Sequence, residues 1–181
     1  MKIVKTNFPD VFIFEPKVYG DARGFFYESY NERIFEEAIG KKVNFVQDNH
    51  SLSSKGVLRG LHYQVQNPQG KLVRVTKGAV FDVVVDIRKN SKTFAQWQGF
   101  YLNDENKHIL WVPEGYAHGF LTLSDQAEFL YKVTDFWYPE HERTIIWNDP
   151  TINISWPYVE DIIVSKKDKK GTLINNSDVF K

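Results

Sequence analysis

The segment KLVRVTKGAVFDVVVDI, residues 71–87, gives the clearest indication of the fold. It consists of two valine-rich runs on either side of Thr76-Lys77-Gly78. β-Branched residues favour the pleated backbone of a sheet, and a glycine supplies the positive φ that many tight turns need. We therefore expect residues 71–87 to form a β-hairpin.

Short apolar runs separated by turn residues continue beyond this segment. Further strands are predicted at residues 97–102, 108–112, 119–123 and 127–134, with polar turns at 103–106 and 124–126. One helix is predicted near residues 31–39, with Ser29 or Asn31 as its N-cap and Gly40 as its end. This pattern, with 15% aromatic residues, indicates an all-β fold, a double-sheet jelly roll or a closed barrel with one or few short accessory helices. Such folds enclose a ligand-sized interior.

The length of 181 residues fits one domain and leaves little room for a second independent core. From about Asp161 the sequence becomes polar, with a basic cluster of Lys166, Lys167, Lys169 and Lys170. We expect residues 1–181 to form a single domain whose C-terminal stretch is loosely ordered.

Charge and cysteine content exclude several classes of function. Lysine plus arginine and aspartate plus glutamate both total 23, so no global positive field attracts nucleic acid or anionic lipid. The chain has no cysteine, which excludes a disulfide scaffold, a thiolate nucleophile and cysteine-ligated metal. The first residues resemble neither a signal peptide nor a membrane span. We expect a cytoplasmic protein without nucleic-acid or membrane partners.

The densest group of polar residues runs from Gln47-Asp48-Asn49 through Arg59 and His62 to Lys71. Arg59 and His62 are three positions apart, so strict alternation in a strand places them on opposite faces unless Gly60 introduces a bulge. Arginine suits phosphate, histidine changes protonation near neutral pH, and a lysine can stabilise an oxyanion. Taken singly, however, such residues are more often a packed histidine, a solvated lysine and a surface ion-pair partner.

A second motif, VPEGYAHGF at residues 112–120, resembles the second metal motif of the cupin superfamily. The first cupin motif usually supplies two histidines one residue apart, whereas His62 is followed by Tyr63 and Gln64. His62, Glu114 and His118 are a loose set of ligands for a metal such as zinc. We therefore predict no metal.

A third group is the aromatic run at residues 135–142, DFWYPEHE. Aromatic residues at this density usually belong to a core, and this reading applies to Phe136 and to Tyr138. Pro139 favours a strand end for Trp137, where an aromatic face can stack on a base.

These segments, in this order, resemble the dTDP-4-dehydrorhamnose 3,5-epimerase family, whose members have the cupin fold and act in dTDP-L-rhamnose biosynthesis. The likeness covers nearly the whole chain. It rests on DARGFF at residues 21–26, QDN at 47–49, GVLRGLHYQ at 56–64, PEGYAHGF at 113–120, Tyr131-Lys132 and SKKD at 165–168. The resemblance implies a cupin-type jelly roll and epimerisation at C3 and C5 of dTDP-4-keto-6-deoxy-D-glucose to dTDP-4-keto-L-rhamnose, without a cofactor.

The resemblance also implies roles for four residues. His62 is the base, paired with Asp168, whose carboxylate orients the imidazole. Lys71 stabilises the enolate oxygen at C4, and Tyr131 returns a proton to the opposite face of the sugar. Inversion requires such a pair of groups on opposite faces, together with a stabilised enolate.

The family's nucleotide contacts fall on a wider set of positions, namely Arg23, Glu28, Gln47, Asn49, Arg59, His118, Glu142 and Lys167, with Trp137 at the position that stacks on thymine. Arg23, Arg59 and Lys167 are expected to bind the diphosphate. In this family the N-terminal segment contributes to the partner's site, so Arg23 and Glu28 are expected to act across a homodimer interface. The stacking position is commonly tyrosine, and Trp137 lacks its hydroxyl.

Two alternatives remain at this stage. A related enzyme that inverts only C3 or only C5, or a ketoisomerase, needs a similar base and nucleotide site, although a ketoisomerase has no need of Tyr131. A non-catalytic sugar-nucleotide-binding cupin would not require His62, Lys71, Tyr131 and Asp168 together.

Overall fold

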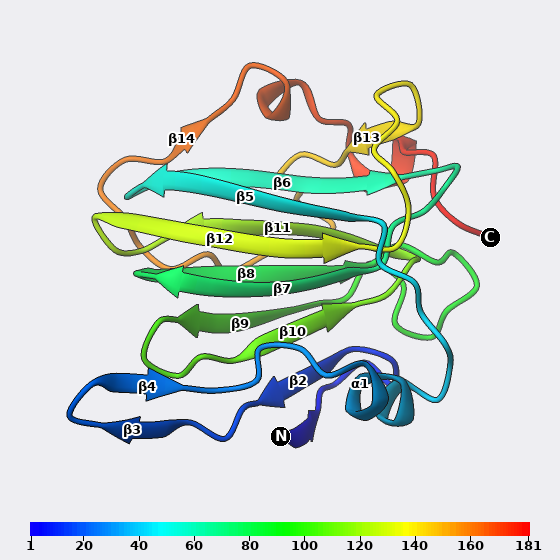
Figure 1. The fold of residues 1–181 in the computed structure, drawn as a ribbon. Coiled ribbons are helices and arrows are strands. Elements are labelled where there is room, and N and C mark those ends of the chain that lie inside the picture. The colour runs from blue at the N-terminus through cyan, green and yellow to red at the C-terminus, as the bar shows by residue number, and fades with distance from the viewer.

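Two sheets packed face to face form the body of the protein, which confirms the all-β prediction (Figure 1). The structure is a computed structural model that describes residues 1–181. Sheet I contains, in spatial order, β1 (Lys2–Lys5), β2 (Phe12–Glu15), β10 (Ile109–Val112), β7 (Lys71–Lys77), β12 (Gln126–Val133) and β5 (Gln47–Ser54). Sheet II contains β13 (Glu142–Thr144), β6 (Val57–Gln64), β11 (Tyr116–Thr122), β8 (Ala79–Asp86) and β9 (Trp97–Asn103), with β14 (Ile163–Val164) beside β6. A small hairpin of β3 (Tyr19–Asp21) and β4 (Gly24–Phe26) stands apart.

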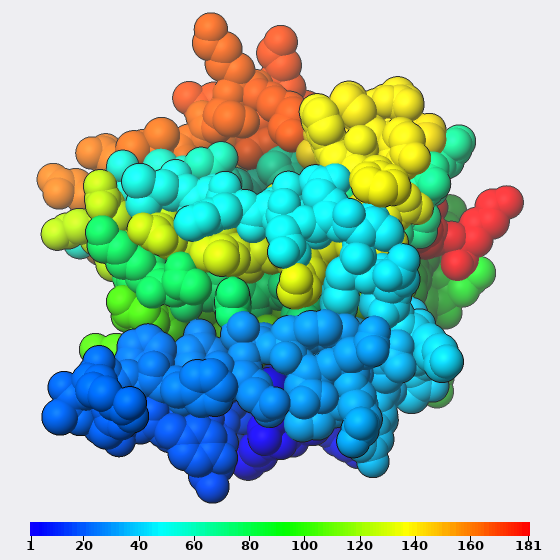
Figure 2. Space-filling model, viewed as in Figure 1, coloured from blue at the N-terminus to red at the C-terminus, as the bar shows by residue number.

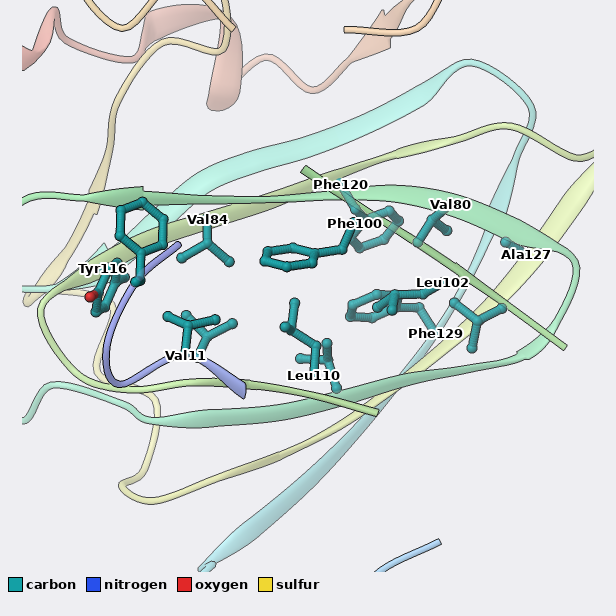
Figure 3. Packing of buried hydrophobic residues seen from close by; sticks show 14 residues of the cluster. Val11, Val80, Val84, Phe100, Leu102, Leu110, Tyr116, Phe120, Ala127 and Phe129 are labelled. Atoms are coloured by element: carbon teal, nitrogen blue, oxygen red, sulfur yellow. The ribbon is translucent and has the colours of Figure 1, made fainter. Parts of the chain in front are cut away.

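The main core lies between the two sheets (Figure 3). Val80 and Val84 of β8 and Phe100 of β9 face Leu110 of β10 and Phe129 of β12 across it. The rings of Phe120 and Phe129 stack with their centroids 4.2 Å apart, so they join the two sheets directly. This apolar packing fixes the spacing of the sheets, on which the neighbouring cavity depends.

The prediction of a hairpin at residues 71–87 is wrong, although both strands exist. Strand β7 pairs with β10 and β12 in sheet I, whereas β8 pairs with β11 and β9 in sheet II. Gly78 has the expected positive φ of 74°, and a Cβ there would lie 2.0 Å from the carbonyl oxygen of Gln126. The turn therefore carries the chain from one sheet to the other. A valine-rich run predicts a strand but not its partner, and nearly all of β8 is buried between two layers.

The other predicted elements agree with the structure to within a few residues. Helix α1 (Glu32–Ile39) begins at Asn31, whose Oδ1 accepts a hydrogen bond from the Ile34 amide at 3.2 Å, and ends at Gly40 with φ of 72°. Ser29 is therefore not the cap. The helix packs Phe35 against Trp111 on the outer face of sheet I, with ring centroids 5.0 Å apart. No helix in the structure has the length and apolar character needed to span a bilayer.

The C-terminal stretch is well packed, so the prediction of loose order is wrong. Strand β14 pairs in parallel with β6, and two 3₁₀ turns, η1 (Asp168–Lys170) and η2 (Ile174–Asn176), follow. Ile174 is buried and Phe180 packs beside it on the outer face of sheet II. The Phe180 amide also donates to the carbonyl of Ile87. A few apolar residues spaced through a polar segment are enough to anchor it, and Figure 1 shows the segment lying over β6.

Candidate active site

A cavity of about 580 Å³ lies between the sheets beside the core, a volume within the usual range for small-ligand sites. Its walls come from β6 and β11 of sheet II, from β7 and β12 of sheet I, and from the C-terminal segment. The predicted residues that line it are His62, Lys71, Tyr131, Asp168, Arg59, His118, Trp137, Glu142 and Lys167. A smaller cavity of about 230 Å³ shares five of its lining residues and adds Gln47, Asn49 and Gln69.

The bulge expected at Gly60 is present and places Arg59 and His62 on the same cavity. His62 lies opposite His118 and Arg59 lies opposite Phe120, so three steps on β6 match two on β11. Gly60 has φ of 126°, and a Cβ there would lie 2.6 Å from the Cα of Gly119. Only glycine allows the two strands to approach so closely at this point.

His62 and Asp168 meet although they are 106 positions apart. His62 Nε2 donates to Asp168 Oδ1 at 2.6 Å, since an ionised carboxylate can only accept. Asp168 Oδ2 accepts from the Gly60 amide at 3.3 Å, and the Ser165 hydroxyl accepts from the Asp168 amide at 3.0 Å. Burial alone would raise the pKa of Asp168, but the hydrogen bond and charge of His62 and the bond from Gly60 hold it below its usual range. In the neutral ring this bond places the proton on Nε2 and leaves Nδ1 as the nitrogen that can accept one.

Lys71 and Tyr131 lie on sheet I, across the cavity from His62. Burial lowers the pKa of Lys71 to about 8, although the charges of Glu142 and Asp82 oppose this shift. Its ammonium makes a long contact of 3.4 Å with the carbonyl oxygen of His62. Burial raises the pKa of Tyr131, with Arg59 opposing and Glu142 adding to the rise, so the phenol keeps its proton at neutral pH. The two side chains thus offer a cation and a proton donor in a desolvated site.

His118 forms a second histidine–aspartate pair on sheet II. Its Nε2 lies 2.9 Å from both carboxylate oxygens of Asp82, which is fully buried on β8. Glu114 instead contacts Lys41 and Thr134. The three residues considered as metal ligands therefore have separate partners, and no group of three or more histidine, aspartate or glutamate side chains is arranged to hold a metal ion.

Polar and aromatic residues surround the mouth of the cavity. Lys167 Nζ forms an ion pair with Glu142 Oε1 at 3.0 Å. Gln47 Nε2 donates to Asn49 Oδ1 at 2.8 Å. Arg59 Nε donates to the Ser53 hydroxyl at 3.0 Å. Bonds of this kind hold charged groups in place beside a site that suits an anionic ligand.

Phe136 and Trp137 lie in the connection between β12 and β13, and both are more than half exposed. The reading of Phe136 as a core residue is therefore wrong, since the connection turns both rings toward solvent. Tyr138 is partly buried and packs against His141. Trp137 lines both cavities, so its ring is accessible from the site.

Two predicted residues lie outside the cavity of their own chain. Arg23 is at the tip of the β3–β4 hairpin, where it pairs with Asp21, and Glu28 contacts Asn31 before α1. Figure 2 shows this hairpin, in blue, at the lower left of the molecule. Its side chains Phe25 and Phe26 are 63% and 67% exposed.

Sequence reasoning missed Asp82 and Ser165. Asp82 interrupts the apolar run of β8, and this is the signal that could have identified it, since a carboxylate buried there needs a partner. Ser165 lies three residues before Asp168, a spacing at which a serine hydroxyl can accept a hydrogen bond from the later amide, as it does here.

Comparisons with known proteins agree with this geometry. Residues 5–176 match the family described as dTDP-4-dehydrorhamnose 3,5-epimerase. A Pseudomonas aeruginosa protein of that name is 59% identical over 180 residues, which cover 99% of each chain. The Legionella pneumophila epimerase RmlC, solved in complex with dTDP-4-keto-L-rhamnose, has a TM-score of 0.96 at 52% identity, covering 98% of this chain and 94% of that one. The 3'-monoepimerase ChmJ of Streptomyces bikiniensis, solved with dTDP-quinovose, has a TM-score of 0.90 at 29% identity, covering 94% and 86%.

The two-sheet fold, which these epimerases share over almost the whole chain, places the protein among the cupin-type isomerases. Within that class, the chain belongs to the dTDP-4-dehydrorhamnose 3,5-epimerase family, because the family match and the relatives extend over almost its full length.

Proposed function

We propose that the protein converts dTDP-4-keto-6-deoxy-D-glucose to dTDP-4-keto-L-rhamnose by inverting C3 and C5. The observation that carries this proposal is the placement of His62 and Tyr131 on opposite sheets that face one cavity. A base and an acid on opposite sides of a bound sugar are what inversion of a carbon requires.

The proposed reaction proceeds by proton transfer through an enolate. His62 Nδ1 takes the proton from a carbon next to the C4 ketone, and the electron pair of the C–H bond moves to the ketone oxygen. The Lys71 ammonium stabilises that oxygen, and Asp168 stabilises the imidazolium. Tyr131 then donates its phenolic proton to the opposite face of the same carbon. The histidine and the tyrosine return to their starting states by proton exchange with solvent, so the reaction needs no oxidant or reductant.

The same proposal assigns the nucleotide to the mouth of the cavity. Arg59 and Lys167 would contact the diphosphate, Trp137 would stack on the thymine ring, and Gln47, Asn49, His118 and Glu142 would complete the site. Cationic side chains and an exposed aromatic face suit a diphosphate joined to a base.

Arg23 and Glu28 would act on the site of a second copy in a homodimer of single-domain chains. The support is the exposed, aromatic β3–β4 hairpin and the separation of both residues from their own cavity. Mixing Arg23→Ala protein with His62→Ala protein tests this directly, because mixed dimers then regain one intact site. If Arg23 serves its own chain, mixing restores no activity. A cytoplasmic location remains a prediction from the sequence.

NMR of the enzyme with this substrate in deuterium oxide tests the activity. We expect deuterium at both C3 and C5, with inversion at both. Exchange at C3 alone would favour monoepimerisation, the activity named for ChmJ.

His62→Ala should abolish exchange at both carbons and leave dTDP binding nearly intact. His108→Ala is the matched control, because His108 lies just before β10 near Glu15 and does not line the cavity. Full exchange in His62→Ala would exclude His62 as the base.

A further inference from the structure

Gln64 is the last residue of β6, and its side chain is buried with only 3% of the residue exposed. Its Nε2 donates to the carbonyl of Asn67 at 2.7 Å and to the carbonyl of Phe136 at 3.1 Å. Its Oε1 accepts from the amide of Tyr138 at 2.7 Å. All the polar atoms of the side chain are therefore bound to backbone groups, and none is directed to the sugar-nucleotide site.

Two of these three bonds are to the backbone on either side of Trp137. The Phe136 carbonyl belongs to the peptide group before Trp137, and the Tyr138 amide belongs to the peptide group after it. The orientations of these two peptide planes define φ and ψ of Trp137, so one buried side chain holds the backbone conformation of that residue. The exposed rings of Phe136 and Trp137 give this connection little anchorage of their own.

We propose that Gln64 is a positioning residue that holds Trp137 for stacking on the nucleotide base. This inference rests on the proposed function, which assigns the stacking role to Trp137. Gln64 is two residues from His62 on the same strand. Strand β6 would therefore present the catalytic histidine to the sugar and also set the position of the Trp137 ring that stacks on the nucleotide base.

Only a primary amide suits this position. The Phe136 and Asn67 carbonyls need donors and the Tyr138 amide needs an acceptor, and glutamine offers two N–H groups and one oxygen at the required reach. A glutamate of the same shape would place an acceptor against two carbonyl oxygens. The buried mismatch would release the connection at Trp137 while leaving the cavity walls in place.

The test measures inhibition of the full-length enzyme by two ligands. Thymidine diphosphate has a base to stack, whereas pyrophosphate carries the diphosphate alone. For Gln64→Glu we expect the inhibition constant of thymidine diphosphate and the KM of the substrate to rise about tenfold, a change typical of a lost base–aromatic contact. The pyrophosphate constant and kcat should change less than twofold. Gln66→Glu is the matched control, because it adds the same charge at an exposed position two residues away.

A double-mutant cycle with Trp137→Ala separates positioning from general damage. Gln64→Glu should add little to the loss of thymidine diphosphate affinity when Trp137 is already absent. An equal loss in both backgrounds, or parallel loss of pyrophosphate binding, would overturn the inference. If Trp137→Ala itself leaves thymidine diphosphate affinity unchanged, the stacking role fails and the inference fails with it. If Gln64→Glu does not fold, Gln64→Met keeps the length without the charge and allows the same cycle.

Discussion

The two walls of the cavity hold their ionisable groups in different ways. On sheet II, each histidine bonds a buried aspartate, His62 to Asp168 and His118 to Asp82. On sheet I, Lys71 makes only a long contact to a carbonyl, and no hydrogen bond contributes to the pKa shift of Tyr131. The histidine wall is thus organised by partners within the protein, whereas the lysine–tyrosine wall is governed by desolvation.

This difference suits the order of events in the proposed reaction. A base must hold one tautomer before the substrate arrives, so its partner has to be built into the fold. A group that stabilises the enolate oxygen or donates a proton is better left without a strong hydrogen-bond partner in the protein, because it can then form its hydrogen bond with the substrate. The comparison predicts that changes on sheet II alter the protonation of the base, and that changes on sheet I alter later steps.

Among the changes that test this contrast, Asp168→Asn is expected to have the largest effect. The Gly60 amide will hold the oxygen of the new side chain, so its NH₂ group will face His62 Nε2. Nε2 must then accept a hydrogen bond, and the ring proton moves to Nδ1, the atom required to act as the base. We expect the rate of solvent-deuterium exchange to fall by roughly 10³-fold, as measured by NMR.

Binding of thymidine diphosphate provides the control for Asp168→Asn and should change less than twofold. Exchange within tenfold of the wild-type rate would show that the aspartate does not set the tautomer of His62. The proposed role of the sheet II partners in preparing the base would then be wrong.

This contrast shows which features could be predicted from the sequence. The bulge that brings Arg59 and His62 to one cavity follows from Gly60, a local feature, and the helix ends follow from Asn31 and Gly40. The partner of His62 cannot be predicted from a local feature, because Asp168 lies in a polar segment 106 positions away. Only the family resemblance links the two residues.

Long-range pairing explains the errors as well. Residues 71–87 have the composition of a hairpin, yet the preference of each strand for neighbours from distant segments places β7 and β8 in different sheets. The average polarity of the C-terminal segment predicts loose order, but its order depends on a few apolar contacts such as Ile174 with the face of sheet II. Such contacts depend on the completed fold rather than on local composition.

A smaller effect is expected for Tyr131→Phe, on the opposite wall. The variant keeps the ring and its packing near Phe129 but loses the proton donor. Inversion should fall about 10²-fold, whereas deuterium exchange should fall much less, because abstraction by His62 does not use the phenol. Both rates come from the same NMR time course. Equal losses in the two rates would show that Tyr131 positions the sugar rather than protonating it.

The smallest effect is a change with pH, and it concerns Lys71. Its pKa of about 8 means that the cation is present below that pH and is lost as the pH rises through it. We expect kcat/KM to be about tenfold lower at pH 9 than at pH 7, since one protonated group is required. Tyr131 cannot account for this decrease, because its pKa is raised above its ordinary value near 10.

Lys71→Arg keeps the charge at every pH in this range, so its profile should stay flat above pH 8 even if its plateau is lower. A decrease at the same pH in Lys71→Arg would assign the titration to another group, and desolvation would no longer distinguish this wall from the other.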